Sequence, residues 1–113
     1  MSPQLRAALE QELAAARARQ QAGSLDAAFA HLERAHILSQ RYAFAHAGVH
    51  LRMWRLGWAR RDMRELLGQS TRFVAALIFS RLWVPRGNTG GANVSAFRPM
   101  PVPEDLRAVL EAN

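Results

Sequence analysis

Apolar side chains recur at intervals of three and four residues along most of the first 84 positions, which is the repeat of an amphipathic helix. This repeat predicts four helices, over residues 4–22, 25–40, 42–56 and 61–82. Gly23 separates the first two, and Gly57 or the residues after it are expected to end the third. We therefore expect an all-α protein whose helices pair into hairpins and form a compact bundle over residues 1–84.

The composition changes after the bundle. Residues 85–103 contain four of the five prolines and three of the seven glycines, so regular structure is not expected there. This segment should run extended over the bundle as an arm, with Phe97 and Val102 as apolar anchors. Residues 104–113 then form a short closing helix. The three parts are expected to make one helical domain, residues 1–113, with enough apolar side chains for a core.

Polar residues interrupt the apolar faces of the second and third predicted helices. His36 falls near the middle of the apolar arc of the second helix, and Glu33 lies beside it, one turn earlier. His46 and His50 lie one turn apart on the same side of the third helix. Because helices joined by a short turn pack antiparallel, these four side chains are expected to face one another.

This cluster has the composition of a transition-metal site. Imidazole nitrogen and carboxylate oxygen suit Zn, Fe, Mn, Ni and Cu. The ERAH segment is a Glu-x-x-His pair like those of di-iron carboxylate bundles, but that class needs two such pairs and this chain has one. We therefore predict a transition-metal-binding protein, acting in metal handling or in a metal-dependent reaction. Its candidate ligands are Glu33, His36, His46, His50 and, from the fourth helix, Glu65, with Asp62 or Gln69 as alternatives.

Two other functions fit the same residues. The segment GSLDAAFAHLERA resembles the second half of a tetratricopeptide repeat, and Gly57 follows Gly23 by 34 residues, the period of that repeat. In that interpretation the chain is a protein-interaction module whose histidines are structural and hydrogen-bonded. In the other, His46 or His50 is a general base in the apolar pocket of a small enzyme.

The GNTGGANV segment of the arm is rich in glycine, and the amides of such a loop can bind an anion. It lacks the GK[ST] of a nucleotide-binding loop, and no strand is expected before it. A tight structural turn is therefore favoured, in which Asn88 and Asn93 bond to the backbone. The alternative is a lid that closes over the histidines.

Composition narrows the set of partners. The net charge is +6 and every basic residue is arginine, but no recognised motif accompanies the charge, so nucleic-acid binding is not expected. The absence of cysteine excludes disulfides and thiolate ligands. The longest apolar run, residues 73–84, is too short to span a bilayer, and a cytoplasmic location is expected. The aromatic residues Trp54, Trp58, Phe79 and Trp83 either pack in the core or contribute to a small apolar pocket or a homodimer surface.

Several of these segments together resemble a small bacterial family of unknown function. They are ERAH, the HxxxH pair, the GQ of ELLGQ and GNTGGANVSAFRP, in that order along the chain. The resemblance covers about residues 32–103, and it implies a compact helical protein, with no established activity. One difference from the family pattern is Ser39, where a glycine is expected.

Overall fold

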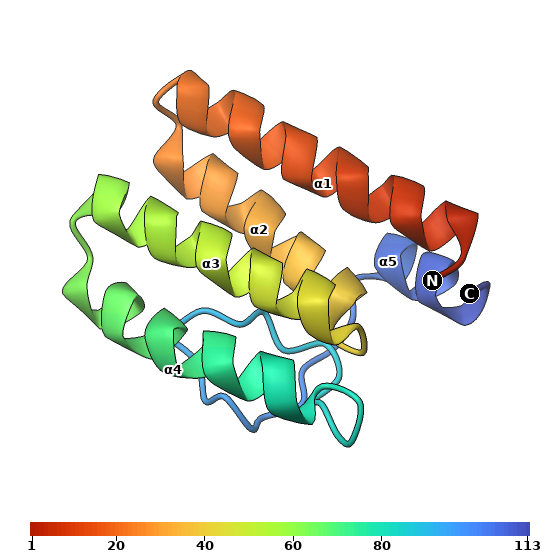
Figure 1. Cartoon of the computed structure of the whole chain (residues 1–113). Helices are drawn as coiled ribbons and strands as arrows, with labels where there is room; N and C mark the ends of the chain where they lie inside the picture. The colour runs from red at the N-terminus through yellow and green to blue at the C-terminus, as the bar shows by residue number, and fades with distance from the viewer.

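The computed structural model describes all residues, 1–113, and is built from helices without a strand. The helices are α1 Pro3–Gln21, α2 Leu25–Ser39, α3 Ala43–Arg60, α4 Met63–Phe79 and α5 Glu104–Glu111. The first four form two antiparallel hairpins, α1–α2 and α3–α4, and α5 packs against α1 and α2 close to the N-terminus (Figure 1). The predicted all-α class is therefore confirmed. No helix is both long enough and apolar enough to cross a membrane.

Local signals set several helix ends. The Ser2 hydroxyl caps α1 by accepting a hydrogen bond from the Leu5 amide at 3.1 Å. The Asp62 carboxylate caps α4 in the same way, through the Glu65 amide at 3.1 Å. Arg61 has a φ of 55° and ends α3 in the left-handed conformation. The third helix is therefore longer than predicted and stops after Arg60.

The apolar core lies among the first three helices. Leu5, Leu38, Met53 and Leu56 are almost completely buried there, and Leu106 of α5 closes one end. Burying an aliphatic side chain of this size is worth about 1.5–3 kcal/mol. The core thus holds α2 and α3 side by side, which determines where their polar residues meet.

The orientation of α4 differs from the prediction. The sequence spacing predicts one apolar face with Met63, Leu66, Leu67, Phe73, Val74 and Leu77. In the structure Met63, Leu67 and Val74 are 62%, 68% and 53% exposed. The buried side of α4 carries Glu65 and Gln69 instead. Apolar residues occur on two sides of this helix, and their spacing alone does not show which side is covered.

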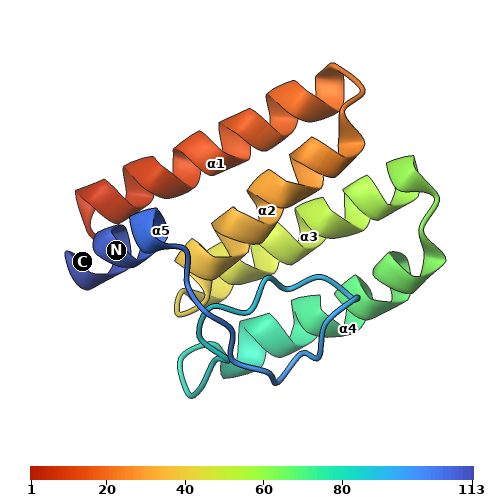
Figure 2. The ribbon, with the colours of Figure 1, turned by 180° about the vertical axis from the view of Figure 1, so that it is seen from behind.

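The segment between α4 and α5 runs back along the α3–α4 hairpin before it reaches α5 (Figure 2). Phe97 is 76% exposed, so the expectation that it anchors the arm is wrong, whereas Val102 packs against the core as expected. Polar contacts hold the arm instead. The Arg72 guanidinium donates to the carbonyl oxygens of Gly90 at 2.9 Å and Val94 at 2.8 Å.

Candidate metal centre

Three imidazoles meet where α2, α3 and α4 come together. His36 lies in the last turn of α2, and His46 and His50 lie in the first half of α3. The Nε2 atom of His46 is 2.8 Å from that of His36, and the Nε2 atom of His50 is 3.1 Å from each of the other two. All three side chains are buried. The structure therefore brings together the three predicted histidine ligands.

The orientation of His50 is determined by a glutamine on α4. Its Nδ1 atom is hydrogen-bonded to Oε1 of Gln69. The side-chain nitrogen of Gln69 donates to Glu65 Oε1 at 2.5 Å and to the Gly90 carbonyl oxygen at 2.7 Å, so the amide cannot be reversed. Because an amide oxygen only accepts, His50 carries its proton on Nδ1.

The other two rings have equivalent partners. The Nδ1 atom of His36 lies 2.7 Å from the backbone carbonyl oxygen of Asn88, which can only accept. The Nδ1 atom of His46 lies 2.7 Å from Oγ of Ser80. That hydroxyl donates its own proton to the Ala76 carbonyl oxygen at 2.6 Å, so it accepts from His46. Both histidines therefore also carry a proton on Nδ1.

The consequence is that the three Nε2 atoms hold no proton. A neutral imidazole has a single N–H, and in each ring the hydrogen-bond partner fixes it at Nδ1. Three lone pairs then point into one buried space without a donor among them. Unsatisfied buried acceptors cost free energy, so this arrangement favours a cation between the rings.

A proton is disfavoured as that cation at neutral pH. Burial, together with the charge of the neighbouring His50, lowers the pKa of His46 to about 3. Burial lowers the pKa of His50 to about 4 and outweighs its hydrogen bond to Gln69, which raises it. Burial and the other two rings lower the pKa of His36 well below its usual range. The rings are thus neutral near pH 7, the state in which imidazole binds a metal ion.

The donor set fits a transition-metal ion. Metal–imidazole bonds of about 2.0–2.1 Å in a tetrahedral site place the ligand nitrogens about 3.3–3.4 Å apart. The distances here, 2.8–3.1 Å, are only slightly shorter, so a small outward rotation of the rings would make room for an ion. Metal-bound histidines also typically donate their second nitrogen to a carbonyl or carboxylate oxygen, and each ring here makes a comparable bond. The buried triad could therefore hold a metal ion.

The two predicted carboxylates lie outside the group of ligand atoms, which consists of the three imidazoles. Glu65 is buried, but its oxygens accept hydrogen bonds from the Gln69 side chain and from the Ala92 amide at 3.0 Å. Glu65 therefore orients the Gln69 amide, which in turn is hydrogen-bonded to His50. Glu33 is only partly buried and bonds to Thr89, and burial raises the pKa of its carboxyl group.

Two residues that orient the rings were not identified as such from the sequence. Ser80 falls within the predicted fourth helix and follows Gln69 by three helical turns, so it lies on the same side of that helix. That spacing was the available signal. Asn88 contacts His36 through its backbone carbonyl oxygen, and such a contact cannot be predicted from the pattern of side chains. Its side chain bonds the loop together, donating to the carbonyl oxygens of Ser95 and Arg98, both at 2.7 Å.

A pocket of about 650 Å³ adjoins the three imidazoles. Its polar end is formed by the histidines together with Gln40, Ser80 and Asn88. Its walls carry eight apolar residues from α4, the turn after it and the arm, namely Ala75, Ala76, Phe79, Leu82, Trp83, Val84, Ala96 and Phe97. The triad is thus buried within the fold but opens onto a space large enough for a small organic molecule.

Comparison with known proteins gives a family without an assigned activity. The family described as "Protein of unknown function (DUF3703)" matches residues 3–110, so the chain belongs to this family. This agrees with the resemblance to a small family of unknown function. Searches of the curated proteins and of the solved structures find no match.

Proposed function

We propose that this member of the DUF3703 family binds one transition-metal ion through the Nε2 atoms of His36, His46 and His50. The observation that carries the proposal is the shared tautomer: every ring donates from Nδ1, and every Nε2 lone pair points to the same space. A structural triad would satisfy its rings by hydrogen bonds among themselves, and these rings have no proton available for such bonds.

The chemistry of the donors selects among metals. Three imidazoles without a carboxylate or thiolate suit borderline ions such as Zn(II), Cu(II), Ni(II) and Fe(II). Mg(II) and Ca(II) prefer oxygen ligands, so three imidazoles should bind them weakly. Mn(II), which also favours oxygen, is the least suited of the metals considered from the sequence.

Three protein ligands leave a coordination position for another molecule. Structural zinc sites are usually closed by four protein ligands, whereas catalytic and exchange sites keep one position open. Because the triad borders a 650 Å³ pocket, the open position is accessible to a small molecule. This arrangement supports a metal-dependent reaction or metal transfer more than a purely structural ion.

Glu65 and Glu33 take a different role in this proposal from that of direct ligands. Glu65 holds Gln69, which in turn holds His50, and such indirect partners strengthen metal binding by orienting the ligand. Glu33, close enough to Glu65 for their charges to interact, adds negative charge near the cation. A carboxylate in either position partly offsets the charge of a divalent ion.

The test is metal binding by untagged protein with a matched histidine control. Metal-free protein is titrated with Zn(II) and with Co(II), whose visible absorption is strong in four-coordinate sites. Wild type and His31→Ala should each bind one ion, because His31 bonds to Glu12 on α1, away from the triad. His46→Ala should lose at least 100-fold in affinity.

Three outcomes separate the candidate functions. Equal metal binding by His46→Ala and wild type would overturn the proposal. No metal binding by the wild type, together with loss of stability in both His46→Ala and His50→Ala, would favour the interaction module with structural histidines. No metal binding with a hydrolytic activity that depends on His46 or His50 would favour a general base in the pocket.

A further inference from the structure

We infer that the pocket beside the triad binds an amphiphilic carboxylate, with its carboxylate on the metal ion and its apolar body against α4 and the arm. This inference rests on the proposed metal site and names the class of molecule that would occupy the open position. Three features of the pocket carry it: the separation of its polar and apolar ends, its exposed apolar mouth and its charge.

The two ends of the pocket differ in chemistry. The three imidazoles at the polar end are buried, whereas the apolar residues Phe79, Trp83 and Phe97 are more than half exposed. A hydrophilic metabolite would leave its polar groups unpaired against these apolar residues, which is unfavourable. A molecule with one polar head and an apolar body satisfies both ends.

The mouth of the pocket exposes large apolar side chains. Leu82 is 79% exposed, Phe97 76%, Trp83 56% and Phe79 54%, although all four line the same pocket. Exposed apolar residues that gather around one opening commonly mark a binding surface. Covering them with an alkyl or aromatic body would contribute favourable free energy in proportion to the area buried.

Charge determines the nature of the head group. Neutral imidazoles leave the charge of a divalent ion uncompensated, and Arg72, which also lines the pocket, adds a positive charge. The Arg72 guanidinium is hydrogen-bonded to backbone carbonyl oxygens and forms no salt bridge with a carboxylate. Glu65 and Glu33 together compensate for two of these three positive charges, so one remains. An anionic head is therefore preferred over a neutral alcohol or an amine, and a carboxylate oxygen is a suitable fourth ligand.

The experiment compares four probes on the Co(II)-loaded full-length protein: acetate, octanoate, octanol and octylamine. Acetate and octanoate should both change the visible spectrum, because both place an oxygen on the metal, and octanoate should bind at least tenfold more tightly. Octanol and octylamine should leave the spectrum unchanged. Equal affinity for acetate and octanoate would overturn the inference while metal binding, and so the proposed function, stands.

Variants of the apolar wall locate the binding site. Ala75→Phe should fill the pocket and remove the preference for octanoate without changing the affinity for acetate. Ala18→Phe, at an exposed position on α1, is the control.

Phe97→Asp changes a side chain that is already 76% exposed, so the fold should be retained. It should lower the affinity for octanoate and leave the affinity for acetate unchanged. Unchanged octanoate binding in both Ala75→Phe and Phe97→Asp would overturn the inference. Failure of the wild type to bind Co(II) at all would instead overturn the proposed function.

Discussion

A single glycine shows how closely the arm fits the histidine triad. Gly90 has a φ of 82°, in the left-handed region that favours glycine, and a Cβ atom built on it would lie 2.5 Å from the His36 ring. The backbone of the arm therefore lies directly against the imidazole. Neither a larger residue nor a different backbone conformation is compatible with the position of His36.

We expect Gly90→Ala to weaken metal binding at least tenfold, because the added methyl group must displace the His36 ring or the loop. The matched control is Gly23→Ala, at a position with a φ of 79° where the added Cβ would meet no atom within 4 Å. Both substitutions strain the backbone by about 1 kcal/mol, but only Gly90→Ala acts on the triad. Isothermal titration with Zn(II) and thermal unfolding of both variants separate the two effects, and equal loss of affinity in both would contradict this view.

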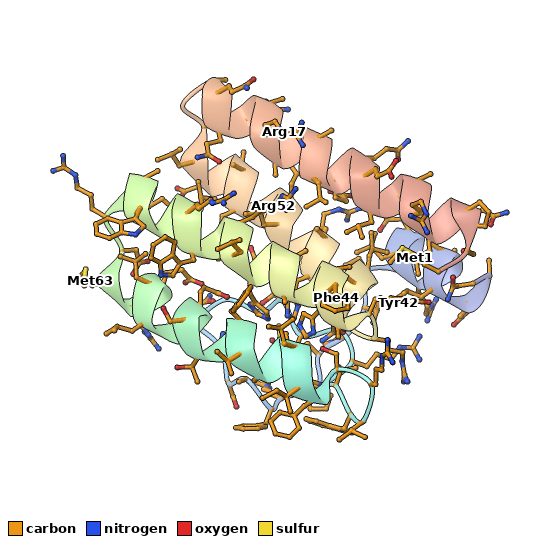
Figure 3. All side chains as sticks on the ribbon, viewed as in Figure 1. Met1, Arg17, Tyr42, Phe44, Arg52 and Met63 are labelled. Carbon is orange, nitrogen blue, oxygen red and sulfur yellow. The ribbon has the colours of Figure 1, made fainter.

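At the scale of helices, both α3 and α4 present apolar side chains to solvent. Phe44, Leu51 and Trp58 recur every seven residues along α3, and Met63, Leu67 and Val74 follow a similar spacing along α4. Figure 3 marks opposite ends of the hairpin at Phe44 and Met63. These residues are from 37% to 82% exposed. The apolar surface that they form exceeds what an isolated residue or two would leave uncovered.

We expect this surface to pair with the same surface of a second copy. Two antiparallel hairpins related by a two-fold axis form a four-helix arrangement, in which heptad-spaced residues interdigitate. A stable complex usually buries roughly 800 Å² per subunit. The exposed residues of α3 include one charged side chain, Arg55, and those of α4 from Met63 to Val74 include one, Arg64, so few charges lie on this surface.

The measurement is molar mass by light scattering over a range of concentrations. Wild type should dissociate only on dilution, while Leu67→Glu should be a monomer at all concentrations because it would bury a charge at the interface. Ala18→Glu adds the same charge on α1, away from this hairpin, and should remain a dimer. A monomeric wild type at high concentration would show that this surface has another role.

At the scale of the whole molecule, the three histidines connect stability to pH. Their pKa values in the folded state lie below the ordinary 6.5, at about 3 for His46 and about 4 for His50, and lower than usual for His36. The unfolded chain therefore binds more protons than the folded chain between these values, so stability falls as pH decreases from about 6.5 toward 4. Each ring contributes up to about 1.4 kcal/mol per pH unit in that range.

Urea unfolding of metal-free protein in the presence of a chelator, at pH 7.5, 6 and 5, tests this expectation. Stability should decrease steeply over the series, and His50→Gln should reduce the steepness by about one third because one of three titrating groups is removed. A flat profile between pH 7.5 and 5 would mean that the rings are not buried as a neutral group.

The sequence contained much of this architecture, but not all of the site. Helical periodicity predicts the first four helices and places the three histidines on facing arcs, because those features depend on residues close together in the chain. It does not reveal that Glu33 and Glu65 stay outside the triad, since this depends on small rotations of α2 and α4. The exposed face of α4 was assigned to the core for a similar reason: Met63 and Leu67 have the spacing of core residues, whatever covers them.

The contribution of the arm was hardest to predict. The carbonyl oxygen of Asn88 contacts His36 across 52 positions of sequence, and Gly90 lies against the same ring. A hydropathy pattern describes side chains and so does not predict contacts made by backbone atoms. The path of a proline-rich segment depends in addition on its contacts with the folded bundle. The glycine-rich loop therefore acts as a tight turn, and its contact with the triad gives it a positioning role as well.

The separation of the histidines and the arm along the sequence also affects the order of folding. His36 and His50 are only 14 positions apart, so the loop that joins them closes rapidly and at small entropic cost, whereas the arm must dock from far along the chain. At the proposed metal site, an ion would then be captured by the α2–α3 pair before folding is complete. Later, the arm can detach by local opening while the core helices stay intact, because it is held by hydrogen bonds and few buried apolar side chains. Exchange of the ion would then depend on the rate at which the arm opens, without unfolding of the whole chain.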